Sequence, residues 1–442
     1  MLARLTSRLL KRDSGPRIPH TNASSSCASR LPPEILLCIF GYLRRVPPDW
    51  TTMMSLILAN HRPEHISNTL RDLRATCLVC RAWRDCAATL LYSSVYLRTA
   101  RQLYALLRTL NHRPASSALV RSIRLPDETR ELPEHPPVSR LFSPRKRRLR
   151  NIARAVDTLL ARCAQTTEIV FRVNTPNMAS IHGFFATAAQ LERVEFAAGP
   201  RDTIARIFRD PVHLRFPRGS LLADPPMKQL TLQGLFLGST NELYFPELRS
   251  LHVHFCASEP GWLRNLLEHS PKLEVLYIES LFVAEMLYWD VDELRAGAAS
   301  LRELRLDWSR RDIGMGFGFL ARLAVLEISL RCLTREDVAF TLPPTLETLI
   351  LSSRGLIFRS GTSRNTLLTA VAKVKRKLHG WKFHDTPRLS TLRLTGDVYG
   401  SRVLRDWAMV SFLFGPYCRG VNVDFEVSLL YVWALYHRYL SS

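Results

Sequence analysis

A leucine pattern that returns along the chain constrains the fold of this protein more than any other feature. The pattern is Leu-x-x-Leu-x-Leu or a close variant, and it occurs at residues 191–196, 227–232, 248–253, 273–278, 301–306, 323–328, 346–351 and 389–394. Five of the seven intervals between successive starts lie within about 20–29 residues, a period that is typical of repeat architectures. One unit of this size cannot bury its own apolar face, so successive units are expected to stack.

The segments between the leucine motifs predict helices. Residues 258–268 combine Ser258 as a cap, an acid in the first turn, an early proline and apolar residues at helical spacing. Similar patterns predict helices at 99–110, 151–163 and 180–189, and two looser strands, at 120–125 and 169–173, are expected to begin the series. Strands that alternate with helices in one chain direction predict a parallel sheet with helices outside it.

Residues 98–442 therefore resemble degenerate leucine-rich repeats, which lack the Asn that regular families carry after the last leucine. The resemblance implies an α/β fold, an irregular and curved leucine-rich-repeat-like solenoid with a parallel sheet. The long intervals at 197–226 and 352–388 are expected to be insertions. A general parallel α/β domain remains the alternative.

Alternation along each strand predicts which side chains point away from the leucine core. The leucines face inward, whereas the residue before the last leucine and the residue after it face the other side of the sheet. These outward residues include both charge signs and an aromatic ring, a mixture that favours a protein surface over a phosphate backbone. We expect a protein target to bind a contiguous patch on adjacent strands, made of His254, Tyr277, Glu279, Arg305 and Asp307.

A second feature lies nearer the N-terminus, between residues 31 and 84. Pro32 and Pro33 suit a first helical turn, where a missing N–H costs nothing, and apolar residues then recur every four positions up to Leu43. Val79 and Trp83 repeat this spacing and predict a later helix. Two short helices with such broad apolar faces bury too little if they meet only each other, so a partner is expected.

These segments resemble an F-box, through the start Leu31-Pro32-Pro33-Glu34-Ile35 and the later run Val79-Cys80-Arg81-Ala82-Trp83. The resemblance implies docking onto the Skp adaptor, and through it a cullin, in a Skp–cullin–F-box ubiquitin ligase. The implied adaptor-binding residues, some of which must instead fill the module's own core, are Leu31, Pro32, Ile35, Ile39, Val79 and Trp83. Residues 44–72 are longer than the family usually allows, and 50–59 could add a helix. A helical mini-core without a partner remains the alternative.

The expected organisation is a small all-α F-box-like helical module at 30–97 followed by the repeat domain at 98–442. Residues 1–29 are expected to form a disordered, basic and Ser-rich tail. Residues 1–12 also resemble a mitochondrial transit peptide, so a targeting role for this basic segment stays open.

The formal net charge of +22 favours acidic partners in general. Two dense basic runs lie at 145–150 and 373–377, in what we expect to be loops or insertions, and the first is either a nuclear import signal or a solvated charge run. Neither run is interleaved with aromatic residues that stack on bases, so nucleic-acid binding is not favoured.

The sequence offers little catalytic or membrane chemistry. We find no P-loop, nucleophile elbow or His-Glu-x-x-His motif, and no apolar run near the length of a bilayer span. His252, His254 and Cys256 would share one face of a strand and are plausible zinc ligands, but strand alternation alone produces this arrangement and no fourth ligand is evident. Nine scattered cysteines suit a reducing compartment. We therefore expect no enzyme, cofactor or metal, and no membrane partner.

Together these features predict a substrate-receptor subunit of a Skp–cullin–F-box ubiquitin ligase, located in the cytoplasm, the nucleus or both. The F-box-like module would bind the adaptor, and the repeat domain would bind an unknown protein target. The alternatives are a non-degradative F-box scaffold and a basic nuclear protein associated with nucleic acid.

Overall fold

The structure is a computed structural model. It describes residues 31–43, 71–97, 99–125, 144–173, 190–198, 213–214, 226–238, 245–254, 256–279, 291–297, 299–307, 316–330, 341–353, 364–398 and 401–431. The expected tail at 1–29, the additional helix at 50–59 and the helix at 180–189 lie outside these residues. The chain divides into two compact units, and the boundary between them falls near the end of a helix, between Leu91 and Tyr92.

The first unit is helical in its described part. Helix α2 (Pro33–Leu43) begins at the second proline, and the Leu36 N–H donates to the Pro32 carbonyl at 3.1 Å. Residues 71–76 are also helical, and helix α4 (Arg81–Ser93) follows after a turn. Val79 lies in this turn, so the prediction that it shares a helix with Trp83 is wrong. The Val79 N–H donates to the Thr76 carbonyl at 3.2 Å, which closes the turn before α4 can begin.

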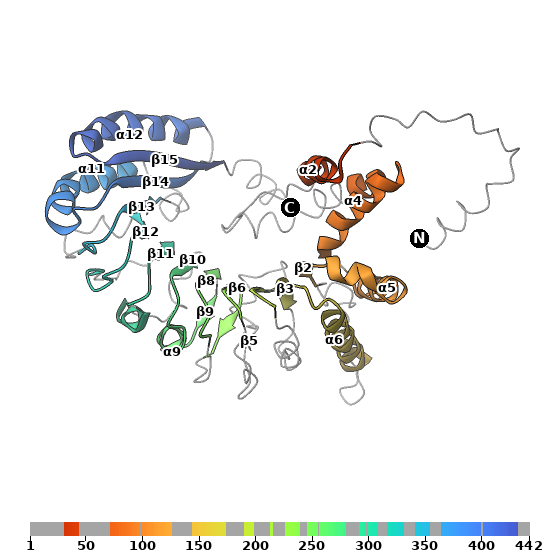
Figure 1. Ribbon diagram of the computed structural model, residues 1–442. Coiled ribbons are helices and arrows are strands. Elements are labelled where there is room, and N and C mark those ends of the chain that lie inside the picture. The colour runs from red at the N-terminus through yellow and green to blue at the C-terminus, as the bar shows by residue number, and fades with distance from the viewer. Residues whose placement is uncertain are drawn as a thin grey trace, which may run out of the picture. The chain divides into compact units, whose positions relative to one another are not determined.

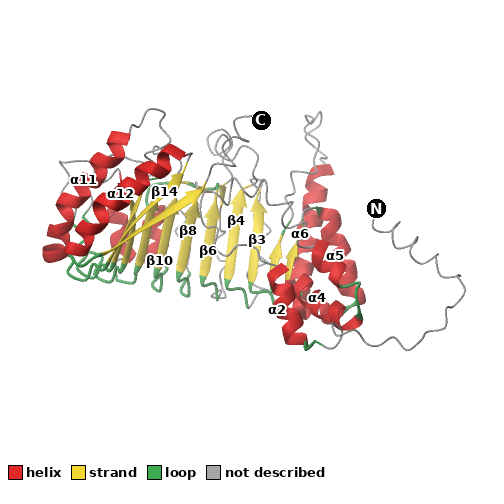
Figure 2. Ribbon diagram, turned by 90° about the horizontal axis from the view of Figure 1, so that it is seen from above, coloured by secondary structure: helices red, strands yellow, loops and turns green. Residues whose placement is uncertain are grey.

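A twelve-stranded parallel sheet forms the second unit, which confirms the predicted α/β class (Figures 1 and 2). The strands lie in the sheet in the order in which they occur along the chain. They are β1 (Ser94–Tyr96), β2 (Ser122–Arg124), β3 (Glu168–Val173), β4 (Arg193–Ala198), β6 (Gln229–Gln233), β8 (Ser250–His254), β10 (Val275–Glu279), β11 (Glu303–Asp307), β12 (Val325–Ser329), β13 (Thr348–Ser352), β14 (Thr391–Val398) and β15 (Asp424–Tyr431).

Each of the eight leucine motifs ends in one of eight successive strands of this sheet, β4 to β14, as predicted. The register aligns equivalent leucines across neighbouring strands, so that Leu251, Leu276 and Leu304 lie side by side. All three are fully buried, as is the first leucine of each motif that has one. The repeated motif therefore produces a continuous row of leucines along one face of the sheet.

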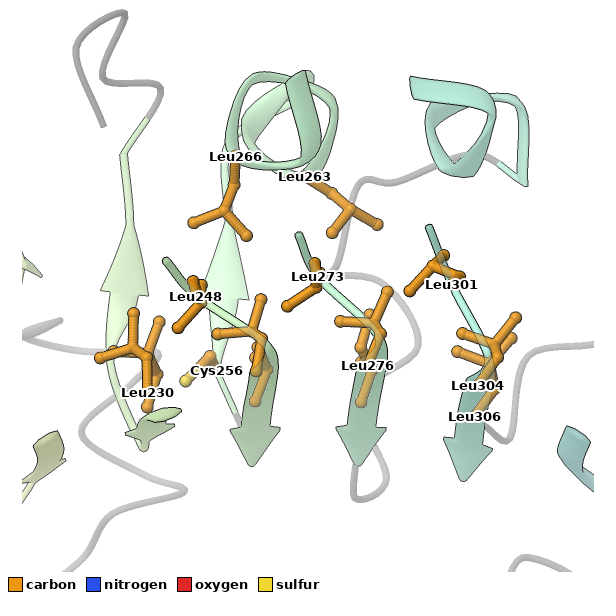
Figure 3. Close-up of a cluster of buried hydrophobic side chains, with 14 of the residues drawn as sticks. Leu230, Leu248, Cys256, Leu263, Leu266, Leu273, Leu276, Leu301, Leu304 and Leu306 are labelled. Atoms are coloured by element: carbon orange, nitrogen blue, oxygen red, sulfur yellow. The ribbon is translucent and has the colours of Figure 1, made fainter. Parts of the chain in front are cut away.

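Helices cover this leucine face. Figure 3 shows Leu263 and Leu266 of helix α9 (Trp262–Glu268) directed toward the strand leucines, which belong to the same buried cluster. Helix α5 (Ala100–His112) matches its prediction, and the Thr99 side chain caps it by accepting from the Gln102 N–H at 3.2 Å. Helix α6 (Pro144–Arg162) includes the helix predicted at 151–163.

Helix α9 begins three residues later than predicted, because Gly261 and not Ser258 is its cap. Ser258 pairs in strand β9 (Ala257–Ser258), which joins β5 (His213–Leu214) and β7 (Phe236–Leu237) in a second, three-stranded parallel sheet. Gly261 then precedes the helix with φ +79°, a conformation that L side chains rarely adopt. Leucine spacing alone gave no sign of this second sheet, of β1 or of β15.

Both basic runs lie in helices, so the expectation that the first run occupies a loop is wrong, whereas the second lies within the interval 352–388 that we expected to be an insertion. Residues 145–150 fall in α6, which starts at Pro144, and residues 373–377 fall in helix α11 (Arg364–Gly380). Arg and Lys are good helix formers, and a proline is well tolerated in a first helical turn. The interval 352–388 also holds a π-helix, η7 (Trp381–Asp385), and helix α12 (Ser401–Gly420) follows strand β14.

Among the helices in the described part of the chain, none is both long enough and apolar enough to cross a bilayer.

Candidate functional site

Helix α2 carries two apolar stripes with opposite environments. Leu36 and Phe40 are buried and form the core of the first unit with Leu73, Cys86 and Ala87. Ile35 and Ile39 lie one turn apart on the neighbouring stripe, and 47% and 46% of their surface is exposed. Leu31 lies just before the helix, four residues ahead of Ile35, and is also exposed. We name Leu31, Ile35 and Ile39 the α2 apolar face.

The turn before α4 presents two further apolar side chains to solvent. Val79 was a predicted adaptor-binding residue, whereas its neighbour Leu78, which is 87% exposed, was not. The signal that could have found Leu78 is the apolar run from Cys77 to Cys80, because a short turn cannot bury every side chain of such a run.

Trp83 differs from the other predicted adaptor-binding residues because it is partly buried and packs against the core of the first unit. Its ring meets Phe40 edge to face, with 5.2 Å between ring centroids and an interplanar angle of 67°. Such aromatic pairs stabilise a fold beyond the area they bury. Pro32 is exposed at the start of α2. The structure thus separates Trp83, which is partly buried against the core, from the exposed members of the predicted set, which are Leu31, Pro32, Ile35, Ile39 and Val79.

The second predicted surface is the sheet face opposite the leucines, where the expected residues do lie on adjacent strands. The register pairs His252 with Tyr277 and His254 with Glu279, and it continues from Tyr277 to Arg305. Asp307 pairs with Glu279 through its backbone position, but its side chain lies outside the described part of the chain.

Most of this predicted patch is buried, so the prediction that it forms an open target-binding surface is wrong for three of its residues. His254, Tyr277 and Glu279 are all buried, and only 2% of Glu279 is exposed. The ring centroids of His254 and Tyr277 are 5.1 Å apart, and those of His252 and Tyr277 are 5.8 Å apart. Neighbouring strands are only about 4.8 Å apart, so bulky rings on adjacent strands cover one another.

Burial also governs the protonation of this cluster. Burial, together with the smaller effects of the charges of His254 and Arg305, lowers the pKa of His252 to about 4. The Ser250 hydroxyl and His252 Nε2 are 2.9 Å apart and form a hydrogen bond. His252 is therefore a neutral imidazole at neutral pH.

The charged groups on this face pair with one another both within a strand and across strands. The Arg305 guanidinium binds the carboxylate of Glu303 and lies 3.7 Å from a carboxylate oxygen of Glu327. Farther along, the Arg393 guanidinium lies 2.6 Å from the Glu426 carboxylate. Arg305 remains partly exposed, but its charge is already matched within the sheet, which weakens it as an anchor for a charged target.

The three residues considered as zinc ligands do not share a face. Strand β8 ends at His254, and Cys256 turns into the leucine core, where Figure 3 shows it among the strand leucines. Its thiol contacts the His254 carbonyl at 3.4 Å, and burial raises its pKa to about 12. Within the residues that the structure describes, no group of three or more His, Cys, Asp or Glu side chains could hold a metal ion.

One surface was missed from the sequence. Helix α12 exposes Phe412 and Leu413, and the Lys375 ammonium of α11 lies 4.8 Å from the centroid of the Tyr417 ring on the same helix. The leucine motifs did not indicate it, although two large adjacent apolar residues in a segment with helical periodicity could have done so.

No family model matches this chain, and no curated protein matches its sequence.

Proposed function

We propose that the protein is a substrate-receptor subunit of a Skp–cullin–F-box ubiquitin ligase, and that its α2 apolar face binds a Skp-family adaptor. The observation that carries the proposal is the exposure of Ile35 and Ile39 beside a buried stripe on the same short helix, with Leu31 exposed just before that helix. The Leu-Pro start and the Val-Cys-x-x-Trp run support the same assignment by resemblance.

The physical argument concerns the free-energy cost of exposing apolar side chains on such a small unit. Branched apolar side chains in contact with water raise the free energy of the free protein, and burying them in a partner recovers that free energy. An exposed apolar cluster of this kind is typical of a protein-binding site. The exposed turn residues Leu78 and Val79 add apolar surface in the same unit.

We further infer that the second unit is a degenerate leucine-rich-repeat solenoid. Strands that follow chain order in one parallel sheet support this assignment, and eight of them are each preceded by a buried leucine or methionine of the motif. A rigid second unit that holds a target would bring the target's lysines near the ligase core. The protein would then contribute proximity and orientation, with no chemistry of its own.

The proposal is tested by co-purification of the full chain with a Skp-family adaptor and a cullin. Ile35→Asp with Ile39→Asp should abolish retention, because each change places a charge in the apolar interface. Tyr104→Asp is the matched control, since it alters an exposed apolar residue of helix α5 in the other unit. Thermal unfolding should show that all three proteins remain folded, as these side chains are already exposed.

Failure of the wild-type chain to retain the adaptor would overturn the proposal. If the adaptor binds but no protein becomes ubiquitinated in a chain-dependent way, the protein is instead a scaffold. A reconstituted ubiquitin-transfer assay in cell extract, with the wild-type and Ile35→Asp/Ile39→Asp chains side by side, separates these two outcomes.

A further inference from the structure

The surface formed by α11 and α12 has a polarity that changes from one helix to the next. On α12, Val410, Phe414 and Cys418 are buried in the core at successive four-residue spacing. Phe412 and Leu413 lie away from that stripe, and 78% and 56% of their surface is exposed. This helix therefore places a bulky apolar pair on the side that does not face the core.

The neighbouring helix supplies positive charge beside this pair. On α11, Val371, Val374 and Leu378 are buried, whereas Lys375 and Arg376 are exposed. Figures 1 and 2 both show α11 and α12 side by side at the C-terminal end of the sheet.

The contact between Lys375 and Tyr417 links the positive charge of α11 to the side chains of α12. The Lys375 ammonium lies 4.8 Å from the Tyr417 ring centroid, which is a cation–π contact. Tyr417 follows Leu413 by one helical turn, so the cation lies on the side of α12 that carries Leu413. We name Lys375, Arg376, Phe412, Leu413 and Tyr417 the α11–α12 surface.

We propose that the α11–α12 surface binds an amphipathic helix of a protein partner, one that carries Asp or Glu along one side of its apolar stripe. Packed helices lie about 8–10 Å apart, which is close to the diameter of one further helix. A helix laid along the seam between α11 and α12 would contact Phe412 and Leu413 with its apolar stripe. Its carboxylates would then meet Lys375 and Arg376.

Other occupants fit these features less well. A phosphate backbone would bind the cations but leave Phe412 and Leu413 in water. A second copy of this chain would bring the same cations to the same place, and like charges repel. An anionic bilayer would satisfy both chemistries, but it would not use the seam between the two helices, and it is therefore an outcome of the test.

This surface is independent of the proposed adaptor site, because it lies in the other unit. It also differs from the predicted patch on the sheet, whose His254, Tyr277 and Glu279 are buried. A failure of adaptor binding would leave this proposal standing, and the reverse also holds.

The test measures binding of a fluorescein-labelled helical peptide to the full chain by fluorescence anisotropy. The probe is a designed peptide with leucines at positions i, i+3, i+4 and i+7 and glutamates along one flank. A second peptide replaces every glutamate with lysine. We expect the wild-type chain to bind the acidic peptide and to bind the lysine peptide at least about tenfold more weakly, since facing like charges disfavour binding.

Two variants test separately the contributions of the apolar side chains and of the positive charges to binding. Phe412→Ser with Leu413→Ser should weaken binding of the acidic peptide about tenfold or more, because the apolar anchors are lost. Lys375→Glu with Arg376→Glu should weaken it similarly and should gain binding of the lysine peptide. This exchange of preference is a result that a merely unfolded variant could not produce.

Arg101→Glu with Arg108→Glu on helix α5 is the matched control, because it makes the same change in net charge at exposed positions elsewhere. Equal loss of binding in this control would mean that net charge alone acts, which overturns the proposal. So would no binding of either peptide by the wild-type chain. Binding to vesicles with 30% phosphatidylserine that needs Phe412 and Leu413, without peptide binding, would assign the surface to a membrane instead.

Discussion

The His254 imidazole and the Glu279 carboxylate meet across two neighbouring strands, with 2.8 Å between Nδ1 and Oε2, and both side chains are buried. They lie on the sheet face opposite the leucines, so this face is itself closely packed in the middle of the sheet. A buried charged or strongly polar group is costly unless it is paired, and each of these two residues pairs with the other.

Replacing Glu279 tests this relationship. Glu279→Ala should lower the free energy of unfolding by about 3–5 kcal/mol, because it leaves a buried imidazole without its carboxylate. Glu247→Ala is the control, since Glu247 pairs with Lys272 at the exposed surface and should cost little. Urea unfolding at neutral pH measures both, and equal effects would show that the His254–Glu279 pair is not buried in solution.

His252 should make stability fall in acid. Its pKa is about 4 in the folded protein and 6.5 in the unfolded reference, so the unfolded chain binds the proton more readily. Stability is therefore fully present above pH 6.5 and decreases as the pH falls from 6.5 to 4. His252→Asn should flatten this part of the stability profile relative to wild type, measured by urea unfolding at several pH values. His384→Asn, at an exposed position, should leave the profile unchanged.

The leucine row should dominate the stability of the second unit. Leu276→Ala should lower the free energy of unfolding by roughly 2–5 kcal/mol, because the residue is fully buried between Leu251 and Leu304. Val275→Ala, one position earlier on the strand and only partly buried, should cost less. If Val275→Ala proves the more damaging change, the leucines do not form the core face.

Adjacent residues of α2 should behave in opposite ways. Phe40→Ala should destabilise the first unit by about 3–5 kcal/mol, because Phe40 is buried against Trp83. Ile39→Ala should change stability little, since its side chain is already largely exposed. Thermal unfolding followed by tryptophan fluorescence compares them, and a larger effect at Ile39 would mean that the stripes of α2 are assigned the wrong way round.

A carboxylate from a later segment should hold the start of α9. Both oxygens of the buried Glu293 accept backbone N–H groups, from Gly261 and from Arg264, at 3.2 Å each. Glu293→Ala should therefore cost about 1–2 kcal/mol, as the loss of a helix cap does. Hydrogen exchange at the Gly261 and Arg264 amides should quicken, whereas Asp292→Ala, at an exposed neighbour, should leave it unchanged. Unaltered exchange in Glu293→Ala would contradict this capping role.

Local patterns predicted the elements because each pattern is complete within a few residues. The leucine motif at 273–278 contains both the buried positions and their alternation, so it identified β10 and its leucine face without any knowledge of the rest of the chain. Thr99 likewise indicated the start of α5, since a cap and the N–H it accepts from are three residues apart. The prediction that Ser258 caps a helix was wrong, because whether this residue caps a helix or joins a strand depends on β7, a segment some twenty residues earlier.

What the sequence by itself determined was the parallel α/β class, the leucine face and the apolar character of α2, because these depend on periodicity within single segments. What only the tertiary structure decided was exposure, which depends on neighbours distant in the chain. Ile39 and Trp83 are both apolar and both were predicted adaptor-binding residues, yet Trp83 packs against Phe40 and is partly buried, whereas Ile39 is exposed. Glu279 and Phe412 make the same point in opposite directions. The Glu279 carboxylate is buried and pairs with His254, a residue twenty-five positions earlier in the chain. The Phe412 ring is exposed to water, because other residues of α12 fill the side of that helix that faces the core.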